Sequence, residues 1–144
     1  MKNINYSPIP KNKHMPEFIS KYEEACAYLK RSIDRPDVSQ YSEKKQRRLN
    51  ADHDLETILE ANNMIANGGK PWEANLADTN EEKWYTWHRI IPDESGSGGF
   101  RLAFSGSIFD DADAFLGARH AAKTKALSDF MGRECIDLYH DTKS

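Results

Sequence analysis

The chain has 144 residues, of which 38% are hydrophobic and 30% are charged, and its formal net charge is −3 at pH 7. This length suits a single domain with a continuous hydrophobic core, and the composition is typical of a globular protein rather than of a disordered chain. The small net charge excludes a strong overall attraction to nucleic acid or to an anionic membrane.

Cysteine usage and the lack of long apolar runs predict a cytoplasmic protein. Cys26 and Cys135 are the only cysteines, and they lack the paired spacing of a zinc site or of a disulfide framework. The first residues, MKNINYSPIPKNKH, contain no apolar run of signal-peptide length. Since no segment approaches the ~18 apolar residues of a membrane span, we expect no contact with membranes.

The chain is predicted to begin with a flexible arm and a helix. Residues 1–15 are rich in Lys, Asn and Pro and poor in apolar residues, which predicts an arm ahead of one domain spanning residues 16–144. Pro16 suits the first turn of a helix, because its missing N–H would be unpaired there. From Glu17 to about Ser32 the apolar residues recur on one helical stripe, so we predict a first amphipathic helix.

A second, longer helix is predicted from Glu43 to Asn67, and it completes a helical part that spans residues 16–69. Ser42 suits its N-cap, and Gly68–Gly69 supplies the left-handed conformation that commonly ends a helix. The first two turns look too polar to be buried, and a solvated helix face is the common explanation of such a charge run. They contain a basic cluster of four residues, Lys44, Lys45, Arg47 and Arg48.

The rest of the chain, residues 70–144, is predicted to form a hairpin and a terminal helix. Residues 83–91 are rich in aromatic and β-branched side chains, and apolar residues alternate with others over residues 100–105. A glycine-rich loop separates the two segments, so we expect an antiparallel hairpin. An amphipathic stripe predicts a helix from about Lys125 to His140.

Three segments of this second half carry a resemblance. They read WEANLADTNEEKWYTWHRI, GFRLAFS and GARHAAKTKALSDFMGRECIDLYHD. In this order they resemble a group of short uncharacterised proteins encoded by gut Bacteroidetes and by their phages and prophages. That group has an N-x-x-KWYPWF-like strand, a GFGFS-like strand, a GSRL-F-K strand and a helix that ends in a DLY-like sequence. The resemblance covers residues 70–141.

The resemblance has consequences for both fold and context. Thr86 stands where the group often has proline, and residues 120–122 replace larger apolar residues. Propensity alone would allow a helix at Ala118–Leu127, whereas the resemblance implies a third strand at Ala118–Lys123. It also implies a phage or mobile-element context in a bacterial host cell, and it implies no catalytic residue or ligand. The matching positions are Asn80, Lys83, Trp84, Tyr85, Trp87, Gly99, Phe100, Ser105, Gly117, Arg119, Lys123, Leu127, Gly132, Asp137, Leu138 and Tyr139.

Together these predictions describe one α+β domain. Two N-terminal helices precede a three-stranded antiparallel sheet, and a C-terminal helix packs on the sheet face that bears Phe100, Leu102 and Phe104.

The first strand divides its aromatic residues between two faces, because side chains alternate along a strand. Residues 84, 86, 88 and 90 share one face, and residues 85, 87, 89 and 91 share the other. One face must lie on the core, and the other could stack nucleic-acid bases or grip a peptide. The candidate binding residues on the sheet are Trp84, Trp87, Arg89, Arg101 and Arg119.

No catalytic constellation favours an enzyme, and neither a cofactor nor a metal site is expected. The sequence has no G-x-S-x-G elbow and no Walker A loop. Asp110, Asp111 and Asp113, with His120 near them, are metal ligands in principle, but the glycine and later glutamate of a calcium loop are absent. A metal-dependent hydrolase is therefore the remotest alternative.

The function expected from the sequence is binding. We expect a small phage-type or mobile-element accessory protein that binds a protein partner or associates with itself. The main alternative is a protein that binds single-stranded nucleic acid with the basic cluster and the sheet aromatics. That alternative predicts salt-sensitive binding, because contacts with phosphates release counterions.

Overall fold

The computed structural model describes residues 17–75, 77–78, 80–92, 99–110 and 120–143, and the arm predicted at residues 1–15 lies outside them. The described residues form four helices and a two-stranded antiparallel sheet, so the chain is an α+β protein. The elements follow in the order α1 (Tyr22–Leu29), α2 (Glu43–Ala66), β1 (Lys83–Pro92), β2 (Phe100–Asp110), α3 (Lys125–Glu134) and α4 (Ile136–Thr142).

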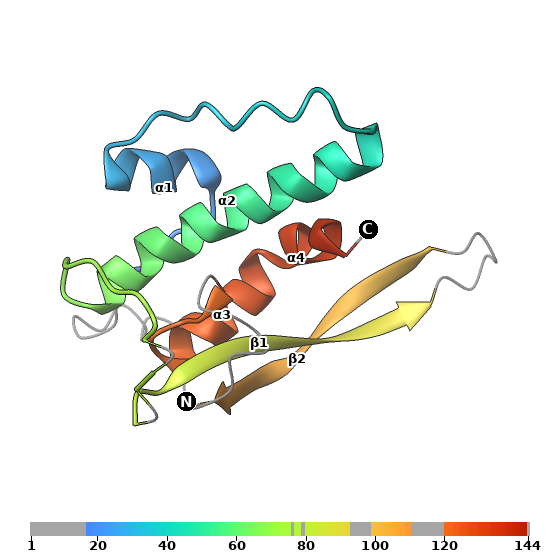
Figure 1. Ribbon diagram of the computed structural model, residues 1–144. Helices are drawn as coiled ribbons and strands as arrows, with labels where there is room; N and C mark the ends of the chain where they lie inside the picture. The colour runs from blue at the N-terminus through green and yellow to red at the C-terminus, as the bar shows by residue number, and fades with distance from the viewer. Residues whose placement is uncertain (1–16, 76, 79, 93–98, 111–119, 144) are drawn as a thin grey trace, which may run out of the picture.

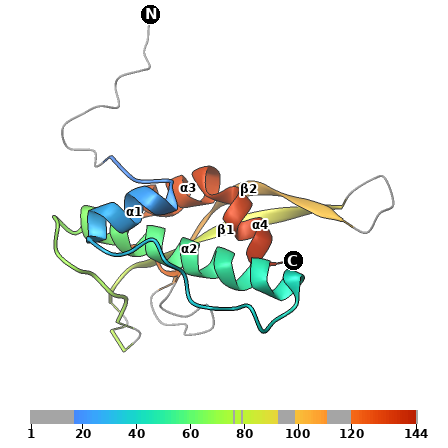
Figure 2. The same ribbon diagram turned by 90° about the horizontal axis from the view of Figure 1, so that it is seen from above.

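These elements stack in three layers (Figure 1). The helices α1 and α2 form one outer layer, α3 and α4 lie in the middle, and the hairpin of β1 and β2 forms the other outer layer. The far end of the hairpin extends past all of the helices in both views (Figure 2). The main core fills the space between the layers, and its fully buried side chains include Leu55, Ile58, Leu59, Leu127 and Met131.

The helix α2 begins and ends as its capping residues predict. The hydroxyl of Ser42 accepts a hydrogen bond from the N–H of Lys45 at 3.3 Å. At the other end Gly68 and Gly69 have positive φ values of 72° and 89°, and the N–H of Gly69 donates to the C=O of Met64 at 2.8 Å. The helix ends at Ala66, one residue before the predicted end.

Asn62 explains why α1 is shorter than the helix predicted over residues 17–32. The chain is not helical until Tyr22, because the backbone of Ile19 is bonded to α2 instead. The fully buried amide of Asn62 accepts a hydrogen bond from the N–H of Ile19 and donates one to its C=O, both at 2.8 Å. A side chain thus satisfies backbone groups that a helix would have paired internally.

The predicted three-stranded sheet is wrong, since β1 and β2 are the only strands in the described part of the chain. Within residues 120–123 only Ala122 pairs with β1, through an isolated bridge to Trp84 with hydrogen bonds of 2.8 and 3.0 Å. The side-chain amide of Asn63 bonds the backbone groups on either side of Ala122. It donates to the C=O of Ala121 at 2.9 Å and accepts from the N–H of Lys123 at 2.8 Å. The segment is therefore held by a side chain of α2 where a sheet would use another strand.

The predicted single C-terminal helix is also wrong, because it is divided at Cys135. This residue has φ −112° and ψ 24°, and it ends α3 and precedes α4. The change of direction lets α3 pack on both strands while α4 packs mainly on α2. One straight helix could not follow both surfaces.

The second strand is longer than the predicted segment 100–105, and it contains a β-bulge. The pairing shifts between Trp87 and His88, which face Gly106 and Phe104, so Ser105 has no partner across the hairpin. Gly106 has φ 140°, a conformation that residues with a side chain rarely adopt. The bulge shifts the alternation of inward and outward side chains in β2 by one residue. The strand continues beyond the bulge to Asp110.

Candidate functional site

The pleat of β1 places one tryptophan inside and the other outside. Trp84 is half-buried against the main core, and its Nε1 donates to the carboxylate of Glu82 at 3.2 Å. Trp87 lies on the opposite face with 55% of its surface exposed. Its cross-strand neighbour is Gly106, so no side chain lies directly opposite the indole ring.

The outer face of the hairpin, as we call the face that bears Trp87, is covered at one end and open at the other. Tyr85 is buried there by a small cluster formed with Trp72, Ala74 and Ala121. Beyond this cluster Trp87, Arg89 and Arg101 are exposed, and so is Ile108, which lies across the hairpin from Tyr85. The covered end fixes the start of β1, and the open end presents aromatic, apolar and cationic side chains to solvent.

Two of the predicted binding arginines share this outer face. Arg89 pairs across the hairpin with Ala103, and Arg101 pairs with Ile91, so the two arginines are diagonal neighbours. Neither forms an ion pair with any residue that the structure describes. Arg119, the third predicted arginine, lies outside the described residues.

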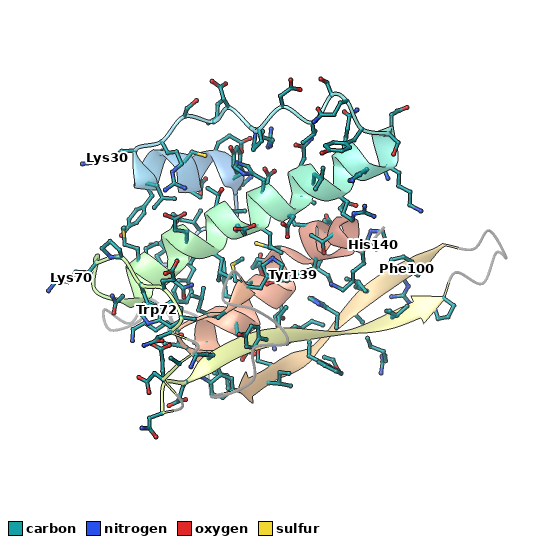
Figure 3. All side chains as sticks on the ribbon, viewed as in Figure 1. Lys30, Lys70, Trp72, Phe100, Tyr139 and His140 are labelled. Atoms are coloured by element: carbon teal, nitrogen blue, oxygen red, sulfur yellow. The ribbon has the colours of Figure 1, made fainter. Side chains whose placement is uncertain are left out.

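The inner face of the hairpin packs on α3 and α4. The Nε2 atom of His88 lies 2.9 Å from the C=O of Gly132, to which it donates, and the imidazole contacts the rings of Phe104 and Tyr139. Figure 3 shows Tyr139 on α4, between the helices and the strands. Burial lowers the pKa of His88, because desolvation disfavours the charged imidazolium and the nearby Lys143 repels it.

The depressed pKa of His88 predicts a pH-dependent stability. The unfolded chain, with a His88 pKa of 6.5, binds more protons than the folded chain, so the stabilisation is complete above this pH and is lost as pH falls below it. We expect the free energy of unfolding to decrease between pH 7.5 and pH 5.5 and the decrease to be smaller in His88→Gln. Urea denaturation of both proteins at the two pH values measures this. Equal decreases would show that His88 does not contribute.

On the edge of β1 that faces away from β2, three residues have no backbone partner among the described residues. Both backbone groups of Trp84 point to Ala122, and since these groups alternate in direction along a strand, those of Thr86, His88 and Ile90 point to the same edge. No described residue pairs with these three along that edge. This edge was not predicted, because the resemblance implied a third strand there.

A hollow of about 270 Å³ lies beside this open edge. We call it the edge hollow. Tyr139 of α4 contributes to its lining, and Ile90, which is 59% exposed, lies farther along β1. The lining residues are Tyr85, Thr86, Trp87, His88, His120, Tyr139, Thr142 and Lys143.

The residues proposed for nucleic-acid binding do not adjoin the sheet surface. Lys44, Lys45, Arg47 and Arg48 lie at the start of α2, in the outer layer opposite the hairpin (Figure 1). The ammonium group of Lys45 lies 4.3 Å from the ring centre of Tyr41, an intramolecular cation–π contact. The basic cluster and the outer face of the hairpin therefore lie on different sides of the molecule.

The proposed metal ligands are not brought together in the described part of the chain. Asp110 ends β2, and Asp111 and Asp113 lie outside the described residues. His120 instead contacts Asp52 of α2, with 3.1 Å between Nε2 and Oδ1. Among the described residues there is no group of three His, Cys, Asp or Glu side chains arranged to hold a metal ion.

Lys83 is an unexpected buried charge at the start of β1. Its side chain is only 1% exposed, and its ammonium group donates to the C=O of Asp78 at 2.8 Å and to that of Glu81 at 3.2 Å. The carboxylate of Glu81 lies 3.6 Å away and also accepts a hydrogen bond from the N–H of Asn75. Lys83 thus holds the preceding loop in place and is not available to a ligand.

The chain matches no protein-family model, no curated protein and no solved structure. The resemblance to phage-encoded proteins consequently stays a prediction. In the described part of the chain, no helix combines the length and apolar character needed to span a bilayer.

Proposed function

We propose that this protein acts by binding another protein through the open part of the outer face of the hairpin. The observation that carries the proposal is the exposed indole of Trp87 on the same face as Arg89 and Arg101, two cations without an ion-pair partner among the described residues. Tryptophan and arginine are enriched among the residues that contribute most to protein–protein binding. A surface with both beside exposed Ile108 is suited to a partner.

The charge of this surface defines the partner's chemistry. The guanidinium groups of Arg89 and Arg101, which have no ion-pair partner among the described residues, favour carboxylates, which they can bind through two hydrogen bonds each. Trp87 and Ile108 favour apolar side chains. We therefore infer that the partner presents apolar residues flanked by Asp or Glu.

The nucleic-acid alternative has less support from the geometry. It requires the basic cluster of α2 and the sheet aromatics to contact one strand, and they lie in opposite layers. The biological context in this proposal, an accessory protein of a phage or mobile element in the bacterial cytoplasm, depends on the sequence alone.

Selection from a displayed library of random peptides tests the proposed binding. We expect the wild-type protein to select peptides that combine Asp or Glu with apolar residues. A Trp87→Ala/Arg89→Glu variant should bind those peptides at least about tenfold more weakly, because central tryptophan and arginine residues commonly contribute 2 kcal/mol or more.

The control is Tyr28→Ala, which removes a 38% exposed aromatic side chain from α1 in the opposite layer. This variant should bind the selected peptides as the wild type does. The proposal is wrong if the wild type selects no peptide, or if the Trp87→Ala/Arg89→Glu variant binds the selected peptides as tightly as Tyr28→Ala.

A further inference from the structure

The open edge of β1 is the better of the two hairpin edges for pairing with another strand. A regular run of Thr86, His88 and Ile90 presents N–H and C=O groups there. The far edge of β2 is interrupted by the bulge at Ser105, and the C=O of Phe100 lies 2.9 Å from Nε2 of His140, which donates to it. Figure 3 shows His140 and Phe100 side by side at this place.

The hairpin also has a physical reason to acquire another strand. Two-stranded hairpins have marginal stability in water unless a third strand or a helix supports them. The far end of this hairpin extends past the helices (Figure 2). On β1 the side chains of Trp87 and Ile90 are exposed. The inner and outer faces of the hairpin thus both contain apolar surface that the described chain does not cover.

The spacing of the open residues suits a second copy of this chain. If two copies of β1 pair antiparallel about a two-fold axis at His88, Thr86 lies opposite Ile90 of the other copy and the two His88 residues face each other. Every open residue is then used, and each opposed pair exchanges two hydrogen bonds.

Neighbouring registers fit less well. A shift of two residues in one direction brings the backbone groups of Trp84 into the pairing, although they are already bonded to Ala122. A shift in the other direction opposes Pro92, which has no N–H, to Thr86. It also places Arg89 opposite Arg89 of the second copy, where like charges repel. The register centred on His88 avoids the Arg89 pair and keeps Trp84 and Pro92 out of the paired run of residues 86–90. Pro92 of the second copy comes next, opposite Trp84, so the pairing ends at Ile90.

The side chains complement each other in this register. On the outer face Trp87 lies opposite Arg89 of the second copy, a pair suited to a cation–π contact that occurs twice by symmetry. On the inner face the exposed Ile90 of one copy lies beside Thr86 of the other, which lines the edge hollow. The apolar side chain and the hollow that can receive it are thus provided by the same edge.

We propose that two copies of this protein pair antiparallel along β1, with Ile90 of each copy seated in the edge hollow of the other. The two hairpins then form one four-stranded sheet, with the outer faces on the same side. This inference rests on the backbone edge of β1 and on Ile90, although the pairing also brings Trp87 and Arg89 of the outer face together, so the two proposals are tested by different variants.

Sedimentation velocity of the full chain over a range of concentrations tests the pairing. We expect the wild type to form dimers. Ile90→Pro removes an N–H that points to the open edge and leaves the bonds to β2 intact, and Ile90→Lys places a charge at the same position. Each variant should weaken dimerisation at least tenfold and keep the folded circular-dichroism spectrum.

Ile33→Lys is the matched control, because Ile33 is 57% exposed, close to the 59% of Ile90, but lies in the segment after α1. It should dimerise as the wild type does. A wild type that stays monomeric throughout the concentration range would overturn the proposal. Dimerisation of folded Ile90→Lys as strong as that of Ile33→Lys would overturn it too, by placing the interface elsewhere. Since Ile90→Lys retains Trp87 and Arg89, peptide binding by this variant tests the proposed function separately.

Discussion

Replacing Asn62 with alanine is expected to lower the free energy of unfolding by about 3 kcal/mol. The change removes two hydrogen bonds to Ile19 and leaves its N–H and C=O without partners, and each unpaired buried group costs about 1–3 kcal/mol. It also removes the contact between the Asn62 amide and the sulfur of Met131, which are 3.4 Å apart. The segment before α1 should detach from α2 as a result.

Asn50→Ala is the control for this change. Asn50 lies on the same helix, is partly exposed, and makes no side-chain hydrogen bond to any described residue. It should have an effect close to zero or slightly stabilising, because alanine has the higher helix propensity. Urea denaturation of both variants gives the comparison. Equal midpoints for Asn62→Ala and Asn50→Ala would contradict the structural role of Asn62.

Gly132→Ala is expected to lower the free energy of unfolding by about 2 kcal/mol, although alanine favours a helix. A Cβ atom at this position of α3 would overlap Oγ1 of Thr86 and lie 2.6 Å from ring atoms of Phe104. Overpacking of this kind costs about 1–3 kcal/mol, and a good helix propensity offsets part of that cost. The glycine therefore permits the close approach of α3 to the hairpin.

A double-mutant cycle with Thr86→Ala tests this explanation of Gly132. The hydroxyl of Thr86 is buried and makes no hydrogen bond, so its removal should cost little and should make room for the new Cβ atom. Gly132→Ala should then be at least about 1 kcal/mol less destabilising in the Thr86→Ala background. Additive effects of the two changes on the free energy of unfolding would show that they do not compete for this space.

The sequence predicts the elements that depend on local rules. The Ser42 cap and the Gly68–Gly69 pair set the limits of α2, and the pleat alone separates Trp84 from Trp87. Which tryptophan is exposed depends on the face that the helices cover. Up to Phe104 the alternation of residues in β2 predicts which side chains point to the helices. Beyond Phe104 this prediction fails, because the bulge at Gly106 shifts the alternation by one residue.

The errors arise where a distant side chain replaces regular backbone pairing. Asn62 and Asn63 are adjacent in sequence, yet each bonds a non-helical segment far away along the chain. No local pattern predicts that these amides shorten α1 or that they replace a strand beside Ala122. The division at Cys135 has a similar origin, since it depends on two surfaces that only the assembled fold provides.

Of the five residues predicted for binding on the sheet, the structure places three on one face, Trp84 against the core, and Arg119 outside the described residues. The sequence identifies Trp87, Arg89 and Arg101 as binding candidates, and the structure places them on one open face. It does not reveal the open edge of β1, since that depends on the segment near Ala122 forming only one bridge. The edge hollow also depends on α4, which lies far from β1 in sequence.

Amide hydrogen exchange along β1 tests the open edge most directly. In dilute solution the amides of Tyr85, Trp87 and Arg89, which point to β2, should exchange slowly, and those of Thr86, His88 and Ile90 should exchange fast. As the protein concentration rises, only the second set should gain protection, because those amides pair with the second copy. Equal protection of both sets at every concentration would contradict an open edge.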